Sequence, residues 1–178
     1  MPQKNILDLL KGGDRRSIGR ADQVAASVSK NPELFRELIA GLRSEDALVR
    51  MRAGDAAEKV SRVTPGLLQP HKDKLLALMA ETEEQELRWH LAAMVPRLRL
   101  NAKERQYAAS LLNRYLEDRS SIVKTCALQG LADLADSDAA IQANAIEALR
   151  EAMRNGTPAM KARSRKLLRL LEHHSAQR

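Results

Sequence analysis

The chain has 178 residues, of which 44% are apolar and 30% are charged, so its composition is that of a folded globular domain rather than a disordered segment. Four aromatic residues and one cysteine argue against a β-sandwich, an internal disulfide framework and a zinc site made only of cysteines. The net charge is +7, no apolar run is long enough to cross a bilayer, and the first residues are too charged for a secretory signal, so we expect a cytoplasmic protein without membrane association.

An internal repeat is the strongest pattern along the chain. Leucines recur every 37 residues, and a pair made of an apolar residue and a base recurs at spacings of 38, 36 and 37. The leucines are Leu38, Leu75, Leu112 and Leu149, and the pairs are Val49-Arg50, Leu87-Arg88, Val123-Lys124 and Met160-Lys161. With a shorter copy at the start, these ladders predict five units, at about residues 2–30, 31–64, 65–100, 101–136 and 137–174.

Each unit is predicted to be a pair of helices. In the second unit, apolar residues fall at helical spacing over 34–42 and again over 49–60, whereas no stretch alternates with the period of a strand. Ser44, Ser120 and Thr157 are expected to cap second helices. Proline lacks the backbone donor that a helix needs, so Pro96 is expected to kink or end its helix.

The segments 46–60, 120–135 and 158–171 resemble HEAT repeats. In each, an acidic or capping residue precedes an apolar–basic pair, and an alanine-rich second helix follows. The resemblance implies an all-α protein, a right-handed, armadillo-like α-solenoid of about five HEAT-like helical hairpins in a single domain. It also implies that the second helices line a concave face used for binding, and that basic residues link neighbouring units.

No sequence motif indicates an enzyme. The chain lacks a phosphate-binding loop, a dinucleotide-binding fingerprint, the HExxH pattern and a nucleophile elbow. Gly12-Gly13 is expected to form a turn rather than a phosphate site, His173-His174 a polar tail rather than a metal site, and Cys126 an inert thiol rather than a nucleophile. We therefore expect no catalytic residue, no metal and no cofactor, although a catalytic site assembled from distant residues stays open.

The base that recurs in each unit has two interpretations. It forms either a stripe for an acidic partner or a set of bridges to carboxylates of neighbouring units, such as Asp46 or Glu84. Stacking would require a base in every unit, whereas a binding site needs a base in some units only. Both this regularity and the resemblance to HEAT repeats therefore favour the bridges.

A column of residues on the second helices is predicted to face away from the core. It contains the only tryptophan, Trp89, a residue type favoured at protein interfaces, and we predict that Trp89 is solvent-accessible and central to the concave face. The candidate protein-binding residues are Met51, Asp55, Arg62, Trp89, Arg97, Thr125 and Gln129. The alternative is that a shift of register, or the curvature of the stack, buries Trp89.

Positive charge is concentrated in the last predicted helix and tail. Residues 150–178 hold 8 bases and 2 acids, whereas residues 1–149 hold 22 bases and 21 acids. Arg165, Lys166 and Arg169 share one helical face there and form a candidate site for phosphates or an acidic protein. The alternative is a polar cap that keeps a terminal repeat in solution.

These features favour a non-catalytic scaffold or adaptor that binds another protein through the concave face. The alternative is nucleic-acid binding through the basic C-terminal repeat, including a remote role like that of the DNA-alkylation-repair glycosylases, which resemble this chain in architecture. Those enzymes place several aromatic residues around an essential aspartate, whereas here a single tryptophan has Asp55 one unit away. A third interpretation is an accessory subunit of a lyase or of a phosphatase-type complex.

Overall fold

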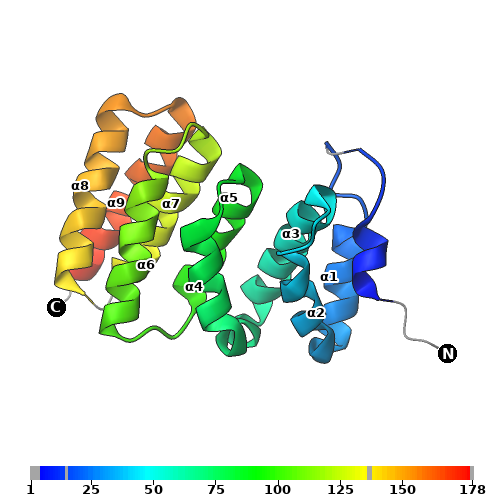
Figure 1. Cartoon of the computed structure of the whole chain (residues 1–178). Coiled ribbons are helices and arrows are strands. Elements are labelled where there is room, and N and C mark those ends of the chain that lie inside the picture. Colours follow the sequence, from blue (N-terminus) through cyan, green and yellow to red (C-terminus); the bar gives the residue numbers. More distant parts are fainter. Residues whose placement is uncertain (1–4, 15, 136–137, 177–178) are drawn as a thin grey trace.

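The computed structural model describes residues 5–14, 16–135 and 138–176, and every regular element in these ranges is helical (Figure 1). The α-helices are α1 (Ala21–Lys30), α2 (Phe35–Gly41), α3 (Ala47–Val63), α4 (Lys72–Glu81), α5 (Gln85–Met94), α6 (Ala102–Tyr115), α7 (Ser121–Leu134), α8 (Ala139–Asn155) and α9 (Pro158–Ala176). The 3-10 helices are η1 (Ile6–Leu10), η2 (Pro32–Leu34), η3 (Pro65–His71) and η4 (Val95–Arg97). The all-α prediction is confirmed for the described residues, and none of their helices combines the length and apolar character needed to cross a membrane.

Side-chain caps define where several helices begin. Ser120 and Thr157 accept backbone hydrogen bonds from the first turns of α7 and α9, as predicted. The prediction for Ser44 is wrong, because the cap of α3 is Asp46, whose carboxylate accepts a hydrogen bond from the Leu48 amide at 2.8 Å. Ser44 instead accepts a hydrogen bond from the amide of Asp46 and so stabilises the turn before the helix.

Proline and glycine interrupt the helices at the predicted places. Helix α5 ends at Met94, and Pro96 lies in the 3-10 turn that follows. Gly12 and Gly13 adopt φ angles of 72° and 85°, a left-handed conformation that favours glycine, in the loop between η1 and α1. The first predicted unit differs from the others, because its first helix is the 3-10 helix η1.

The helices pack in two rows that follow the order of the chain (Figure 1). In one row, α1, α3, α5, α7 and α9 each contact the next. In the other row, α2, α4, α6 and α8 each pair with the α-helix that follows them in the sequence, and η1 packs against α1. We call the row of α1, α3, α5, α7 and α9 the inner row. Its helices contact one another in an unbroken series, so residues on α3, α5, α7 and α9 are brought close to one another.

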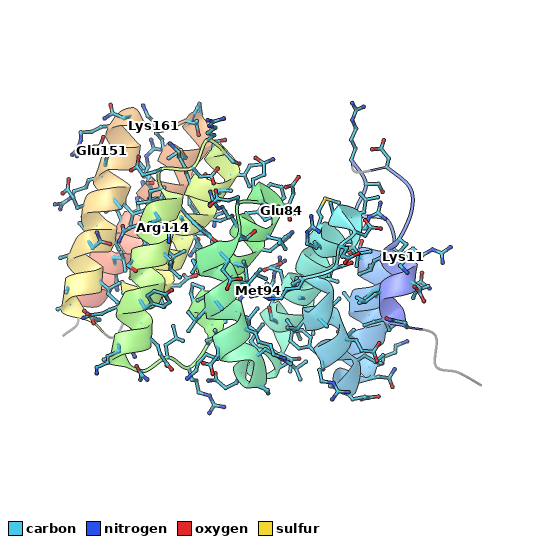
Figure 2. All side chains as sticks on the ribbon, in the orientation of Figure 1. Lys11, Glu84, Met94, Arg114, Glu151 and Lys161 are labelled. Carbon is cyan, nitrogen blue, oxygen red and sulfur yellow. The ribbon has the colours of Figure 1, made fainter. Side chains whose placement is uncertain are left out.

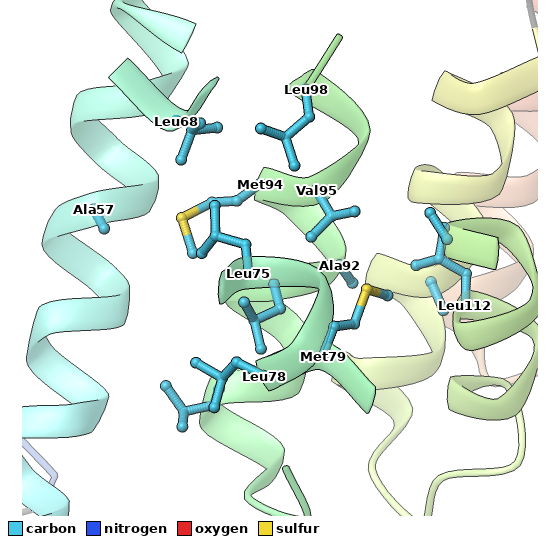
Figure 3. Packing of buried hydrophobic residues seen from close by; sticks show 14 of the residues in the cluster. Ala57, Leu68, Leu75, Leu78, Met79, Ala92, Met94, Val95, Leu98 and Leu112 are labelled. Atoms are coloured by element: carbon cyan, nitrogen blue, oxygen red, sulfur yellow. The ribbon is translucent and has the colours of Figure 1, made fainter. Parts of the chain in front are cut away.

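Apolar side chains fill the space between successive pairs of helices (Figure 3). Leu75 of α4, Met94 of α5 and Leu112 of α6 are fully buried there. Small residues allow α5 and α7 to approach closely, since a Cβ atom at Gly130 would lie 2.8 Å from the carbonyl oxygen of Ala92. Packing of these two helices therefore depends on a glycine at that position.

Candidate functional site

Six of the seven predicted binding residues lie on three successive helices of the inner row. Met51, Asp55 and Arg62 are in α3, Trp89 is in α5, and Thr125 and Gln129 are in α7. Arg62 is exposed, and the other five are half-buried. Helix α3 contacts α5, and α5 contacts α7. Met51, Trp89 and Thr125 are separated by about one repeat length each and so lie at corresponding positions of these adjacent helices.

Trp89 is half-buried and packs against the hydrophobic core. Its ring meets the ring of His90 edge-on, with the two centroids 5.6 Å apart. His90 is buried, and burial lowers its pKa to about 4, although the charges of Asp55 and Glu58 act in the opposite direction. The imidazole beside Trp89 is therefore neutral at neutral pH and adds no charge to this face.

Asp55 is held in an ion pair. Its carboxylate accepts a hydrogen bond from Lys59 Nζ at 2.7 Å, and the same ammonium group lies 2.5 Å from the carboxylate of Asp22 in α1. Asp55 is thus part of a link between α1 and α3, which does not favour a role as an isolated catalytic aspartate.

A buried glutamate engages both arginines of the predicted binding set. The Glu58 carboxylate accepts hydrogen bonds of 2.5 Å from Arg62 and from Arg97. Arg97 also donates to the Glu58 carbonyl oxygen at 3.1 Å and to the Ser61 hydroxyl at 2.8 Å. Burial alone would raise the pKa of Glu58, but the hydrogen bonds from the two arginines hold this pKa below its ordinary value. Arg97 therefore joins η4 to α3, whereas the side chain of Arg62 remains 65% exposed.

The two polar candidates on α7 form local hydrogen bonds. The Thr125 hydroxyl donates to the Ser121 carbonyl oxygen at 2.7 Å. The Gln129 amide donates to Asp133 at 2.7 Å, and its oxygen accepts a hydrogen bond from Arg163 of α9 at 2.7 Å. Gln129 therefore ties α7 to α9 while staying half-exposed.

Two of the recurring bases bridge neighbouring units. Arg50 of α3 forms an ion pair of 2.7 Å with Glu84, which lies just before α5 (Figure 2). Arg88 of α5 forms an ion pair of 2.6 Å with Asp118, in the turn before α7, and lies over the Tyr115 ring at 5.2 Å. At these two positions the base links successive pairs of helices, as the bridging interpretation predicts.

The basic residues of α9 remain accessible. Arg165, Lys166 and Arg169 are exposed, and none of them forms an ion pair within the described part of the chain. Their charges are free to act on a ligand or on solvent.

Arg52 has no sequence signature of a functional residue, yet it is the largest fully buried side chain among the described residues. Its guanidinium donates to the carbonyl oxygens of Leu10, Gly12, Asp14 and Ser17 at 2.7, 2.6, 2.9 and 3.2 Å. Glycines with positive φ bend the loop between η1 and α1 so that these carbonyl groups converge. Arg52 therefore has a structural role at the start of α3.

Cys126 and the histidines show no arrangement for chemistry among the described residues. Burial raises the pKa of the Cys126 thiol, which agrees with the expected inert thiol. No cluster of His, Cys, Asp or Glu side chains suited to a metal ion occurs in the part of the chain that the structure describes. The side chain of His174 lies outside that part.

Comparisons with known proteins inform on the fold alone. No protein family matches the chain, and no curated protein matches it. The chain is similar to the crystal structure of an engineered protein determined by the Northeast Structural Genomics Consortium, with a TM-score of 0.65 and 15% identity over 94% of this chain and 80% of that chain. At this identity the likeness concerns the arrangement of helices alone and carries no information on function.

Proposed function

We propose that the chain is a short HEAT-like α-solenoid that acts as a non-catalytic adaptor and binds another protein along the face of α3, α5, α7 and α9. The succession of contacts along the inner row supports this proposal, because a solenoid unit contacts only its neighbours. The bridges from Arg50 and Arg88 support it as well, since they recur at one repeat position and join adjacent units.

The observation that carries the proposal is the half-exposed Trp89 on the middle helix of this face. Met51 on α3 and Gln129 on α7 lie on the helices to either side and are half-exposed too. An aromatic side chain surrounded by partly accessible polar and apolar groups is typical of the centre of a protein interface.

Affinity capture with matched variants tests the proposal. Wild type, Trp89→Ala and Tyr107→Ala are immobilised and exposed to a lysate of the source cells, and the retained proteins are quantified by mass spectrometry. Tyr107 is the control, because it is 47% exposed but lies on α6 in the other row. We expect a partner that wild type and Tyr107→Ala retain and that Trp89→Ala loses by roughly 30-fold, as for an interface hot spot. Equal retention by all three proteins would refute the role of this face.

Acrylamide quenching gives a second, partner-free readout. Trp89 is the only tryptophan, so all tryptophan fluorescence reports on it. We expect quenching intermediate between a buried indole and a free one, and protection when the captured partner is added. Complete protection in the free protein would contradict a binding role for Trp89.

A second candidate function, nucleic-acid binding, rests on the unpaired basic residues of α9. Binding of a fluorescein-labelled oligonucleotide should weaken linearly on logarithmic axes as salt rises, because each phosphate contact releases counterions. The double variant Lys166→Glu/Arg169→Glu should lower the salt slope by about 2 and weaken binding more than tenfold. The matched control is Arg36→Glu/Lys74→Glu, the same change of charge on α2 and α4. Identical affinities for both double variants would exclude a site on α9.

A further inference from the structure

The face formed by α3, α5, α7 and α9, which we call the inner face, carries more bases than acids toward the ends of α3 and α5. Arg62 lies in the last turn of α3, and Arg97 lies in η4, just after α5. Both donate to the Glu58 carboxylate, at 2.5 Å each. Two guanidinium groups therefore share one acid, and the pair of them keeps a net positive charge.

Arg163 brings a third guanidinium to this region from α9. It donates to the neutral amide oxygen of Gln129 at 2.7 Å, and no carboxylate pairs with it in the described part of the chain. Burial raises the pKa of the Cys126 thiol on α7, the charge of Arg163 opposes the rise, and the charge of Glu58 adds to it. Arg163 of α9 and Glu58 of α3 therefore both lie within electrostatic reach of Cys126.

Bases outnumber acids in this part of the inner face. Its acids are Glu58 and Asp133, since Asp55 is bound by Lys59 and Glu172 lies two and a half helical turns after Arg163, on the opposite side of α9. Its five bases, which we call the basic end of the inner face, are Arg62, Arg97, Arg163, Lys166 and Arg169. Five bases against two acids leave an excess of three positive charges.

Exposed apolar side chains lie beside these bases. Val63, next to Arg62, is 82% exposed, and Leu170, next to Arg169, is 48% exposed. The half-exposed Trp89 lies on α5, between α3 and α9 in the inner row. A phosphate chain gains little from apolar groups, whereas a peptide that combines carboxylates with apolar side chains complements both the charge and the apolar groups of this surface.

We infer that the inner face binds an acidic segment of the partner protein, with carboxylates over its basic end and apolar side chains over Val63, Trp89 and Leu170. This preference for acids rests on the function proposed above, because it concerns the partner of the same face. Arginine suits a carboxylate because its planar guanidinium donates two parallel hydrogen bonds. From α3 to α9, three helix spacings of about 9 Å give roughly 27 Å, which about nine residues of extended chain can cover.

Labelled peptides of about 12 residues test the chemistry of this partner. The test peptide alternates pairs of glutamates with single leucines. One control peptide has glutamine at each glutamate position, and a second has lysine there. A single-stranded oligonucleotide with the same number of negative charges is the nucleic-acid control. Fluorescence anisotropy with the full chain at low salt measures the affinity of each ligand.

We expect the glutamate peptide to bind roughly tenfold more tightly than the glutamine peptide, because its carboxylates accept charge-assisted hydrogen bonds. The double variant Arg62→Glu/Arg163→Glu should weaken the glutamate peptide about tenfold. It should also bind the lysine peptide more tightly than wild type does, which a loss of folding could not produce. The matched control is Arg114→Glu/Arg150→Glu, the same change of charge at exposed positions of α6 and α8 in the other row, and it should stay within about twofold of wild type.

Three results would overturn the inference. Equal affinities for the glutamate and glutamine peptides, both lost in Trp89→Ala, would leave the inner face as a binding surface but remove its preference for acids. Binding of no peptide, or equal effects of the two double variants, would remove the acidic segment as the ligand, and the affinity capture described above would decide separately whether this face binds a protein. Tighter binding of the oligonucleotide than of the glutamate peptide, weakened in Arg62→Glu/Arg163→Glu, would assign the basic end to phosphates.

Discussion

Replacement of Arg97 by methionine tests whether the cluster around Glu58 stabilises the joint between successive units. The substitution keeps a long apolar stem but removes the guanidinium, which makes three hydrogen bonds to residues of α3. It leaves the Glu58 carboxylate, whose side chain is 10% exposed, with the 65% exposed Arg62 as its remaining ion-pair partner.

The expected loss of stability follows from these contacts. A hydrogen bond to a charged group contributes about 1.5–3 kcal/mol, and breaking a fully buried pair costs about 3–5 kcal/mol. The side chain of Arg97 is 24% exposed, and Arg62 still compensates part of the carboxylate charge, so we expect Arg97→Met to lower the free energy of unfolding by about 2–3 kcal/mol. Arg62→Met is the matched control and should cost about 0.5 kcal/mol, because the Arg62 side chain is largely exposed and Arg97 still pairs with Glu58.

Urea unfolding followed by circular dichroism and by Trp89 fluorescence measures both variants. With an m-value of about 2 kcal/mol/M, the midpoint for Arg97→Met should fall by roughly 1 M. The folded-state pKa of Glu58 is lowered, so this stabilisation is present above the unfolded pKa of about 4.3 and is lost as the pH falls through the folded pKa. The difference between wild type and Arg97→Met should therefore shrink at about pH 3. Equal midpoints for Arg97→Met and Arg62→Met at neutral pH, or a difference that does not change with acid, would refute the reasoning.

Further predictions concern α5 and α7. Gly130→Ala should lower the free energy of urea unfolding by about 1–3 kcal/mol, because the new Cβ atom meets the Ala92 carbonyl group. This loss is expected despite the better helix propensity of alanine. A gain in stability would show that α5 and α7 can separate without cost. The pKa of His90 is lowered to about 4, so the neutral imidazole stabilises the fold fully above the unfolded pKa of about 6.5 and this contribution is lost as the pH falls toward 4. The free energy of unfolding of wild type should fall by about 3 kcal/mol between pH 6.5 and pH 4, and that of His90→Gln should fall much less. Parallel profiles of stability against pH for the two proteins would contradict the lowered pKa of His90. The half-buried Cys126 thiol, with its raised pKa, should react with a disulfide reagent at pH 8 at least about tenfold more slowly in the folded protein than in guanidinium chloride. Equal rates would show that the thiol is fully accessible.

Helical periodicity and turn residues were sufficient to predict most elements of this fold. The 3.6-residue spacing of apolar side chains excluded strands, and the conformational limits of proline and glycine located the end of α5 and the first loop. The cap of α3 was misplaced because Ser44 and Asp46 are both good capping residues. The choice depends on Arg50, which donates to the carbonyl oxygens of Ser44 and Glu45 and fixes the turn so that Asp46 meets the helix.

The candidate site was harder to predict, because its partners come from neighbouring units. Angular counting within α3 places Glu58 on the outward side, yet Arg97 reaches it from a position 39 residues later and covers it. The same count gives no sign that Arg52 is buried, since its acceptors are backbone carbonyl groups of a loop and leave no side-chain pattern. The recurrence of a base can therefore be recognised in the sequence, whereas the groups it pairs with depend on how successive pairs of helices pack.

The burial of Arg52 limits how the chain can be shortened. Residues 11–14 and 16–17 lie outside the helices, but this segment, together with Leu10, supplies the acceptors of the guanidinium of Arg52, which is 2% exposed. Deleting this segment would remove all four acceptors and open the Arg52 guanidinium to water. A truncation placed at Ala21, where the first α-helix begins, would therefore remove the contacts that hold Arg52 in place at the start of α3.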